Sequence, residues 1–156
     1  MNTDILSTTF NELMVEVPSG EIELRDDRTK QKWPVNIKPF LLAKFPITQD
    51  IYFNITNETP SIFKGDKRPV ETVTWQEAVI FCNLLSEKSG LKSCYILSEQ
   101  NVEISFDQTA NGFRLPTDFT ICWATFGNGV RTYTTRKYMV HIGFSEVAVG
   151  VTKNVV

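Results

Sequence analysis

Three cysteines and one histidine are the side chains of this 156-residue chain best suited to nucleophilic, redox or metal chemistry. Cys82, Cys94 and Cys122 are widely spaced and form no CxxC pair, whereas a structural zinc site needs about four thiolate or imidazole ligands. Their odd number also argues against a disulfide framework. Because His141 is the sole histidine, most histidine-based metal sites and the common triads are excluded unless it serves as a single base. We therefore assign no catalytic, cofactor-binding or metal-binding residue and expect no cofactor.

Other polar motifs lack the arrangement that catalysis or phosphate binding requires. Asp26, Asp27 and Asp50 form no recognisable acid/base pair. The glycines at 127 and 129 lack the lysine and the helix context of a phosphate loop. Tyr133 and Tyr138 alternate with basic residues, as in some nucleic-acid-binding proteins. A run this short, in a chain of net charge −2, favours a solvated strand face, and we expect no nucleic-acid partner.

Composition predicts a single domain spanning residues 1–156. Hydrophobic residues make up 42% of the chain, which suffices for a buried core, and no linker or repeat divides it. No apolar run approaches the roughly 18 residues of a membrane span, and there is no block of like charges that would favour an anionic membrane. The first twenty residues lack the features of a secretory signal. We therefore expect a cytoplasmic protein without a membrane partner.

The N-terminal third reads as strands. Leu13–Val17 precedes a turn signal at Pro18-Ser19-Gly20, and apolar residues then alternate with acids at Ile22 and Leu24, which predicts a hairpin about that turn. The polar stretch from Glu23 to Lys32 is interpreted as a solvated loop. Alternation resumes at Val35 and Ile37, and Phe40–Phe45 continues in extended form.

Two main helices are expected. Thr74 and Glu77 have the spacing of a capping box, and apolar residues follow at helical spacing up to Leu85, with Gly90 as a terminator. This predicts a helix over Thr74–Ser89. A second helix is predicted from Thr117 to about Phe126, and Thr48 can cap a shorter one through Tyr52 and Phe53.

The C-terminal half is otherwise predicted to be extended. Four strands are predicted, at Tyr95–Leu97, Val102–Phe106, Val130–Val140 and Phe144–Val151. Valines 147, 149 and 151 alternate strongly enough that we expect the last strand to lie within the sheet. We predict that it pairs with a strand near the N-terminus.

Several sequence motifs occur along the chain in a recognisable order. They run from Met14 to Gly20, from Pro39 to Gln49, from Arg68 to Ala78, from Phe81 to Ser86, and from Ala110 to Thr117. Together they resemble the formylglycine-generating enzyme (sulfatase-modifying factor) family over roughly residues 12–127. The resemblance implies an α+β fold, a variant of the C-type lectin fold, with mixed antiparallel sheets and two main helices.

Most of these motifs are interpreted as structural, not as part of a catalytic site. The resemblance implies that Trp75 packs at the entry to the long helix and that Arg114 is a structural donor to loop carbonyls. The residues expected in the core are Trp75, Phe81, Leu85, Phe113 and Leu115.

The departures from the family bear on function. In the enzymes of this family, a segment before the closing strand carries the cysteine pair that holds copper(I) and meets the substrate thiol. Only about fifteen residues separate Gly127 from the phrase His141–Val147 that resembles this closing strand. The segment is therefore interpreted as lost, and nothing in the chain reproduces the pair. Cys82 lies on the apolar face of the long helix, as a buried and inert thiol would.

Two functions from different classes stay open. The first is a non-catalytic member of the family, a pseudoenzyme that acts as a binding or assembly module with a protein partner or a second copy of itself. The alternative is a metal-dependent oxidase of the formylglycine-generating type, whose site is rebuilt from Cys94, Cys122 and His141.

Overall fold

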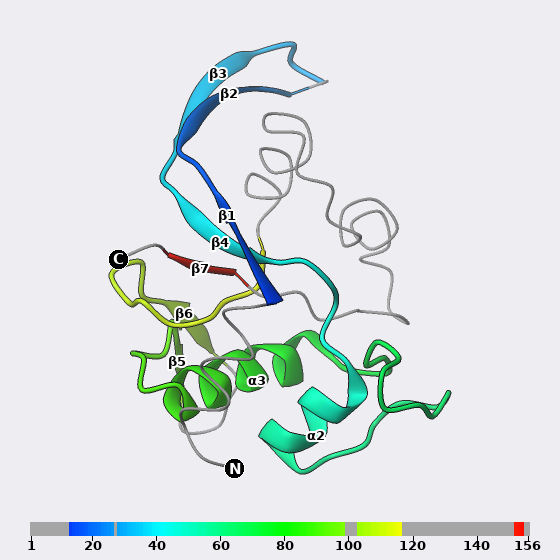
Figure 1. Cartoon of the computed structure of the whole chain (residues 1–156). Helices are drawn as coiled ribbons and strands as arrows, with labels where there is room; N and C mark the ends of the chain where they lie inside the picture. Colours follow the sequence, from blue (N-terminus) through cyan, green and yellow to red (C-terminus); the bar gives the residue numbers. More distant parts are fainter. Residues whose placement is uncertain (1–12, 27, 99–102, 117–151, 155–156) are drawn as a thin grey trace.

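The computed structural model describes residues 13–26, 28–98, 103–116 and 152–154. It is a mixed α+β structure of two helices and small antiparallel sheets (Figure 1). The elements are β1 (Met14–Val17), β2 (Gly20–Arg25), β3 (Lys32–Ile37), β4 (Phe40–Ala43), α2 (Gln49–Thr56), α3 (Trp75–Lys88), β5 (Tyr95–Leu97), β6 (Ile104–Phe106) and β7 (Thr152–Asn154). None of the helices in these described ranges has the length and apolarity to cross a membrane.

The predicted hairpin about Pro18-Ser19-Gly20 is wrong. β1 pairs with β4 and β2 pairs with β3, both antiparallel, so the chain continues outward past Pro18 and reverses only beyond Asp26. The reversal is built from polar groups: the carboxylate of Asp26 accepts from the amide of Arg28 at 2.8 Å, and Lys30 adopts a left-handed φ of 60°. In Figure 1 the β2–β3 arm extends away from the helices.

The predicted solvated loop is shorter than expected. Glu23 belongs to β2 and Lys32 to β3, and their side chains form an ion pair of 2.5 Å across the two strands. Charged side chains suit strands whose faces are in water, so a polar stretch of this kind can form strands as well as a loop. The alternation at Val35 and Ile37 is confirmed, since both pack in a small apolar cluster with Val17 and Phe40.

The long helix is confirmed with its caps. The hydroxyl of Thr74 accepts from the amide of Glu77 at 3.2 Å, and the carboxylate of Glu77 accepts from the amide of Thr74 at 2.7 Å. Gly90 follows with φ of 69°. The short helix begins after Thr48 as predicted, but the Thr48 hydroxyl donates to the carboxylate of Asp50 instead of accepting from a helix amide.

The main core lies between α2, α3 and the sheet β1-β4-β7. Phe81 stacks on Tyr52 at 5.2 Å between ring centroids, and both are buried with Leu85 and Phe113, while Leu115 is half-buried against them. Trp75, expected in this core, is instead 56% exposed. Helical side chains tilt toward the N-terminus, so the first residue of α3 extends beyond the helix end instead of over the core.

The last described strand completes the main sheet. β7 pairs antiparallel with β4, with Leu42 opposite Thr152 and Phe40 opposite Asn154. The predicted helix at 117–126 and the predicted strands at 130–140 and 144–151 lie outside the described residues. The predicted strands at Tyr95–Leu97 and Val102–Phe106 are found as β5 and as the shorter β6, and the two pair with each other antiparallel.

Candidate functional site

Two of the three cysteines lie within the described residues, and both are buried. Cys82 sits on the inner face of α3, and Cys94 immediately precedes β5. Burial raises the pKa of both thiols, and for Cys94 this outweighs the opposing effect of Arg114. Both are therefore thiols at neutral pH, whereas the thiolate is the nucleophile and the metal ligand. Cys122 and His141 lie outside the described residues.

The described residues do not fit the copper(I) that the family resemblance implies. The sulfur of Cys94 faces the carbonyl oxygens of Gly112 at 3.2 Å and Ala110 at 3.9 Å, so its hydrogen-bonding capacity is spent on the backbone. Among these residues no group of three or more histidine, cysteine or acidic side chains converges as metal ligands would. No metal step is assigned to them.

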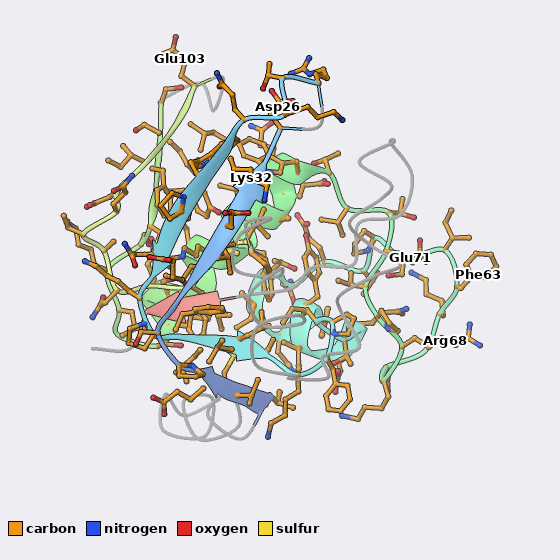
Figure 2. The ribbon with its side chains drawn as sticks, turned by 90° about the horizontal axis from the view of Figure 1, so that it is seen from above. Asp26, Lys32, Phe63, Arg68, Glu71 and Glu103 are labelled. Carbon is orange, nitrogen blue, oxygen red and sulfur yellow. The ribbon has the colours of Figure 1, made fainter. Side chains whose placement is uncertain are left out.

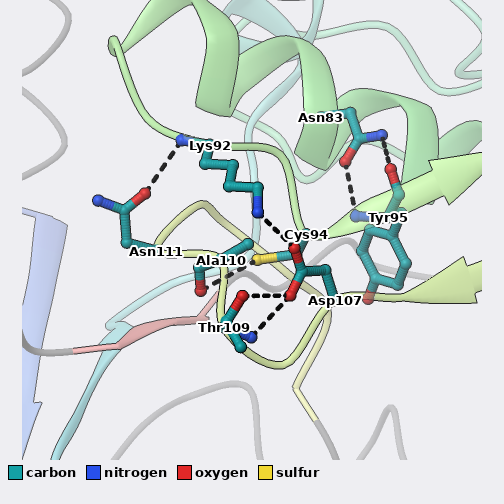
Figure 3. Close-up of polar contacts among 8 residues, drawn as sticks. All are labelled: Asn83, Lys92, Cys94, Tyr95, Asp107, Thr109, Ala110 and Asn111. Atoms are coloured by element: carbon teal, nitrogen blue, oxygen red, sulfur yellow. Dashed lines mark hydrogen bonds and ion pairs between the residues drawn. The ribbon is translucent and has the colours of Figure 1, made fainter.

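The polar residues around Cys94 tie loops to α3 and β5 (Figure 3). The side-chain amide of Asn83 donates to the carbonyl of Tyr95 at 2.7 Å and accepts from its amide at 3.2 Å. The carboxylate of Asp107 accepts from Thr109 and pairs with Lys92 at 2.7 Å. No buried side-chain nitrogen or oxygen of the residues drawn in Figure 3 lacks a hydrogen-bond partner, as is usual for a structural network.

Close packing explains why glycine occupies position 112 of the motif that runs from Ala110 to Thr117. The hydroxyl of Ser86 donates to the carbonyl of Cys82 at 2.7 Å and accepts from the amide of Phe113 at 2.8 Å. A Cβ on Gly112 would lie 2.3 Å from the carbonyl oxygen of Lys92, so only glycine fits. Arg114, expected to bind loop carbonyls, has its guanidinium 5.8 Å from the ring centroid of Phe106.

A different part of the chain has the features of a binding surface. The segment between α2 and α3, residues 57–72, is called the α2–α3 loop below. It exposes two adjacent large apolar side chains, Ile62 at 70% and Phe63 at 65%. Isolated exposed apolar residues are common on protein surfaces, but two neighbours on a fixed loop require an explanation.

One glutamine fixes the outer part of this loop. The side-chain nitrogen of Gln49, at the start of α2, donates to the carbonyl of Phe63 at 3.0 Å and to that of Pro69 at 3.2 Å. Its side-chain oxygen accepts from the amide of Gly65 at 3.1 Å. Three hydrogen bonds from one residue thus join both sides of the loop to a helix.

A carboxylate fixes the loop from its other end. Glu71 accepts from the amide of Phe63 at 2.9 Å and also from the hydroxyl of Thr72, and these two bonds lower the pKa of Glu71. The hydroxyl of Ser61 exchanges bonds with the backbone of Glu71, at 3.1 and 3.3 Å. The conformation of Phe63 is therefore set by groups on both sides of it.

The loop also contains strained backbone. Asn57, at its start, has φ of 64°, and Thr72, at its end, has φ of 61°. Asparagine tolerates the left-handed region, but a β-branched residue there is an outlier. Strain of this kind costs of order 1–3 kcal/mol and clusters at functional sites. The backbone of the α2–α3 loop thus holds Thr72 in an unfavourable conformation, as is common at functional sites.

A cavity of about 390 Å³ lies between this loop and α2. Its walls combine apolar groups of Phe53, Pro60 and Val70 with the polar side chains of Gln49, Asp50 and Lys64. Concave sites of this size and mixed lining are typical of binding sites. The loop therefore offers both protruding apolar side chains and an adjoining hollow.

Sequence reasoning did not single out this loop. The available signal was an apolar pair, Ile62-Phe63, within a polar stretch bounded by Pro60 and Pro69. That pattern predicts a loop, but it does not distinguish an exposed pair from one that folds back onto the core.

Comparison with known proteins confirms the family resemblance. Residues 6–149 match the model of the sulfatase-modifying factor enzyme 1-like domain. The chain is also similar to chaperone protein LppX of Paenibacillus barcinonensis, with 31% identity over 124 residues, which cover 71% of this chain and 44% of that relative. The chain thus spans less than half the length of this curated relative.

Two solved structures share the fold. The structure titled Treponema denticola variable protein 1 matches with a TM-score of 0.65 and 27% identity, over 74% of this chain and 52% of the other. CarF matches with a TM-score of 0.56 and 22% identity, over 72% of this chain and 55% of the other. The likeness to CarF concerns the fold alone.

Proposed function

Because the chain belongs to the family of sulfatase-modifying factor enzyme 1-like domains, we propose that it is a non-catalytic member that binds another protein through the α2–α3 loop. The observation that carries the proposal is the exposed pair Ile62-Phe63 on a loop held by Gln49 and Glu71. A preorganised apolar surface loses little entropy on binding. Aromatic anchors of this kind dominate the energetics of protein interfaces.

The proposal includes the finer fold and the domain organisation. We place the chain in the C-type-lectin-like variant of the fold, as one domain of residues 1–156. A rigid base with long loops is the arrangement in which loops carry function. The α2–α3 loop, joined to α2 by Gln49 and to its own far end by Glu71, matches that arrangement.

A chaperone-type role is consistent with this surface. The relative with 31% identity is named a chaperone protein, and a folding or assembly factor must present apolar groups to its client. Ile62 and Phe63 supply such groups, whereas Ser61 and Val70 of the same loop are buried.

The alternative function, a formylglycine-type oxidase, requires reactive thiols. Cys82 and Cys94 are buried and their pKa values are raised by that burial. Neither is exposed to a substrate thiol, so the described residues give this alternative no support. The site rebuilt from Cys94, Cys122 and His141 stays a hypothesis, because Cys122 and His141 lie outside the described residues.

Selection from a random peptide library tests the proposed binding function. Peptides are selected on the full chain, and their affinities are then measured for the Ile62→Ser/Phe63→Ser double variant. We expect at least a tenfold loss, about 1.4 kcal/mol, because both apolar anchors are removed. Trp33→Ser is the matched control, since Trp33 is also exposed but lies on the β2–β3 arm. Selected peptides that bind the double variant as tightly as the wild type contradict the proposal.

Copper(I) competition tests the oxidase. Reduced protein is titrated against a strong copper(I) chelator and incubated in air with a sulfatase-type cysteine peptide. We expect no stoichiometric copper capture and no oxidised peptide. Capture that disappears in the Cys94→Ser/Cys122→Ser double variant reverses the assignment in favour of the oxidase.

A further inference from the structure

We infer that the tip of the α2–α3 loop, residues 62–69, recognises an acidic protein segment that also carries a large apolar side chain. The inference rests on the proposed function and specifies the chemistry of the partner. Its basis is the combination, on one fixed loop, of exposed apolar residues with Arg68, a cation that has no ion pair with an acid among the described residues.

The tip differs in charge from the rest of the chain. It contains Lys64, Lys67 and Arg68 against one acid, Asp66, within a chain of net charge −2. Lys67 is paired with Asp50 at 2.6 Å, and Lys64 donates to the carbonyl of Thr59 at 2.9 Å. Arg68 forms no ion pair with any residue that the structure describes and is exposed.

The other acids of the loop do not compensate this cation. The carboxylate of Glu71 is engaged with Phe63 and Thr72. Glu58 lines the cavity at the opposite end of the loop. Arg68 is therefore the group with which an incoming carboxylate can pair.

The position of Arg68 follows from Gly65. The amide of Arg68 donates to the carbonyl of Gly65 at 2.9 Å, which closes a tight turn. A Cβ on Gly65 would lie 2.9 Å from Cδ of Arg68, so the aliphatic part of Arg68 lies across the glycine. Figure 2 shows Phe63 and Arg68 on the outer side of the same loop, both directed away from the body of the molecule.

This pairing of residue types indicates the class of partner. Arginine and aromatic residues are enriched at the energetic centres of protein interfaces, and the planar guanidinium binds carboxylates in a bidentate manner. Ile62 and Phe63 require an apolar counterpart, because covering them with purely polar groups would forgo the gain from their burial. An anionic membrane fits less well, since two apolar side chains and two cations without a described ion pair, Lys64 and Arg68, provide weak anchoring.

Three fluorescent peptides test the inference by anisotropy titration against the full chain. The first alternates Glu and Asp with Leu and Phe, the second has Lys in place of every acid, and the third has Ser in place of every apolar residue. We expect the first to bind at least about fivefold more tightly than the second, as one favourable ion pair of about 1 kcal/mol would give. It should also bind more tightly than the third, which lacks the apolar side chains that would cover Ile62 and Phe63. Its affinity should also fall as salt is raised.

Charge-reversal variants test whether the preference for the acidic peptide depends on Arg68. Arg68→Glu should weaken the acidic peptide at least about fivefold, whereas Lys38→Glu, the same charge change at an exposed lysine in the β3–β4 turn, should alter it less than twofold. Equal binding of the acidic and basic peptides, or an unchanged affinity of Arg68→Glu, overturns the inference. Stronger capture by phosphatidylserine vesicles than by the acidic peptide also overturns it and identifies a membrane ligand.

The outcomes separate the two proposals. Binding that depends on Phe63 but shows no charge preference contradicts the acidic partner and leaves the binding function intact. If no peptide binds, or if Phe63→Ser has no effect on any of them, both proposals fail.

Discussion

Phe81 and Phe63 show how differently the same side chain is used in this molecule. Phe81 is fully buried and stacks on Tyr52, whereas Phe63 is exposed on a loop whose backbone is hydrogen-bonded on both sides. Burial of a phenylalanine contributes to stability, but exposure at a fixed position contributes nothing to folding. We infer that the second phenylalanine is maintained for an interaction.

Alanine substitutions distinguish these two roles. Phe81→Ala should lower the free energy of unfolding by about 3–5 kcal/mol, the usual cost of emptying a core site. Phe63→Ala, the same chemical change at the surface, should stay within about 0.5 kcal/mol of the wild type. Urea denaturation measures both. A Phe81→Ala protein as stable as the wild type would show that the helix face is not the core.

Asp107 predicts a pH dependence of stability. Hydrogen bonds from Lys92 and then Thr109 hold its pKa well below the ordinary value of 3.8. A carboxyl with a lowered folded-state pKa stabilises the fold above its unfolded pKa, and that contribution is lost as pH falls through the folded pKa. Asp107→Asn should therefore be less stable than the wild type near neutral pH, and the difference should shrink below about pH 4. A difference that is constant from neutral to strongly acidic pH would contradict this account.

At the scale of elements, local sequence signals correctly predicted the two described helices but did not predict which strands pair. The capping box of Thr74 and Glu77 and the terminator at Gly90 act within a few residues, so α3 could be placed from the sequence. The pairing of β1 with β4 depends on where the chain reverses, and the weak turn signal at Pro18-Ser19-Gly20 did not determine it. The exposure of Trp75 follows from its place as the first residue of α3, where the side chain extends beyond the helix end.

The candidate site was harder to predict for the same reason. A local pattern identifies residues 57–72 as a loop, but the three bonds from Gln49 come from an adjoining helix. Such bonds between distant residues cannot be read from a local pattern. The family resemblance points to cysteines instead, and the two in the described residues are buried.

Gln49→Ala tests whether this side chain maintains the loop. The variant loses the acceptor of the Gly65 amide and the donor to two carbonyls, so exchange of the Gly65 amide should speed up at least about tenfold, as loss of a hydrogen bond of about 1.4 kcal/mol implies. Global stability should change by no more than about 1 kcal/mol, because these bonds lie at the surface. Gln31→Ala, on the β2–β3 reversal, serves as the control. Unchanged exchange at Gly65 would show that the loop is fixed by other contacts.

At the scale of the whole molecule, the sheet is closed by the end of the chain. β7 pairs with β4, whose Phe40 and Leu42 are buried. Two segments more than a hundred residues apart in the sequence thus form one sheet, so its completion depends on the C-terminal residues.

Truncation tests this dependence. Deletion of residues 144–156 removes β7 together with the predicted strand before it, exposes the edge of β4 and should abolish soluble folding. Deletion of residues 155–156 alone leaves β7 and should keep the thermal transition close to that of the wild type. A 144–156 deletion that melts like the full chain would exclude the proposed closure.

We propose that the α2–α3 loop, and not the region of the cysteines, is the binding surface of this molecule. Amide hydrogen exchange of the full chain, with and without a peptide selected from the library, tests that claim most directly. We predict protection concentrated in residues 57–72, with little change around Cys82 and Cys94. Protection that centres on the cysteines and leaves residues 57–72 unchanged would contradict the account.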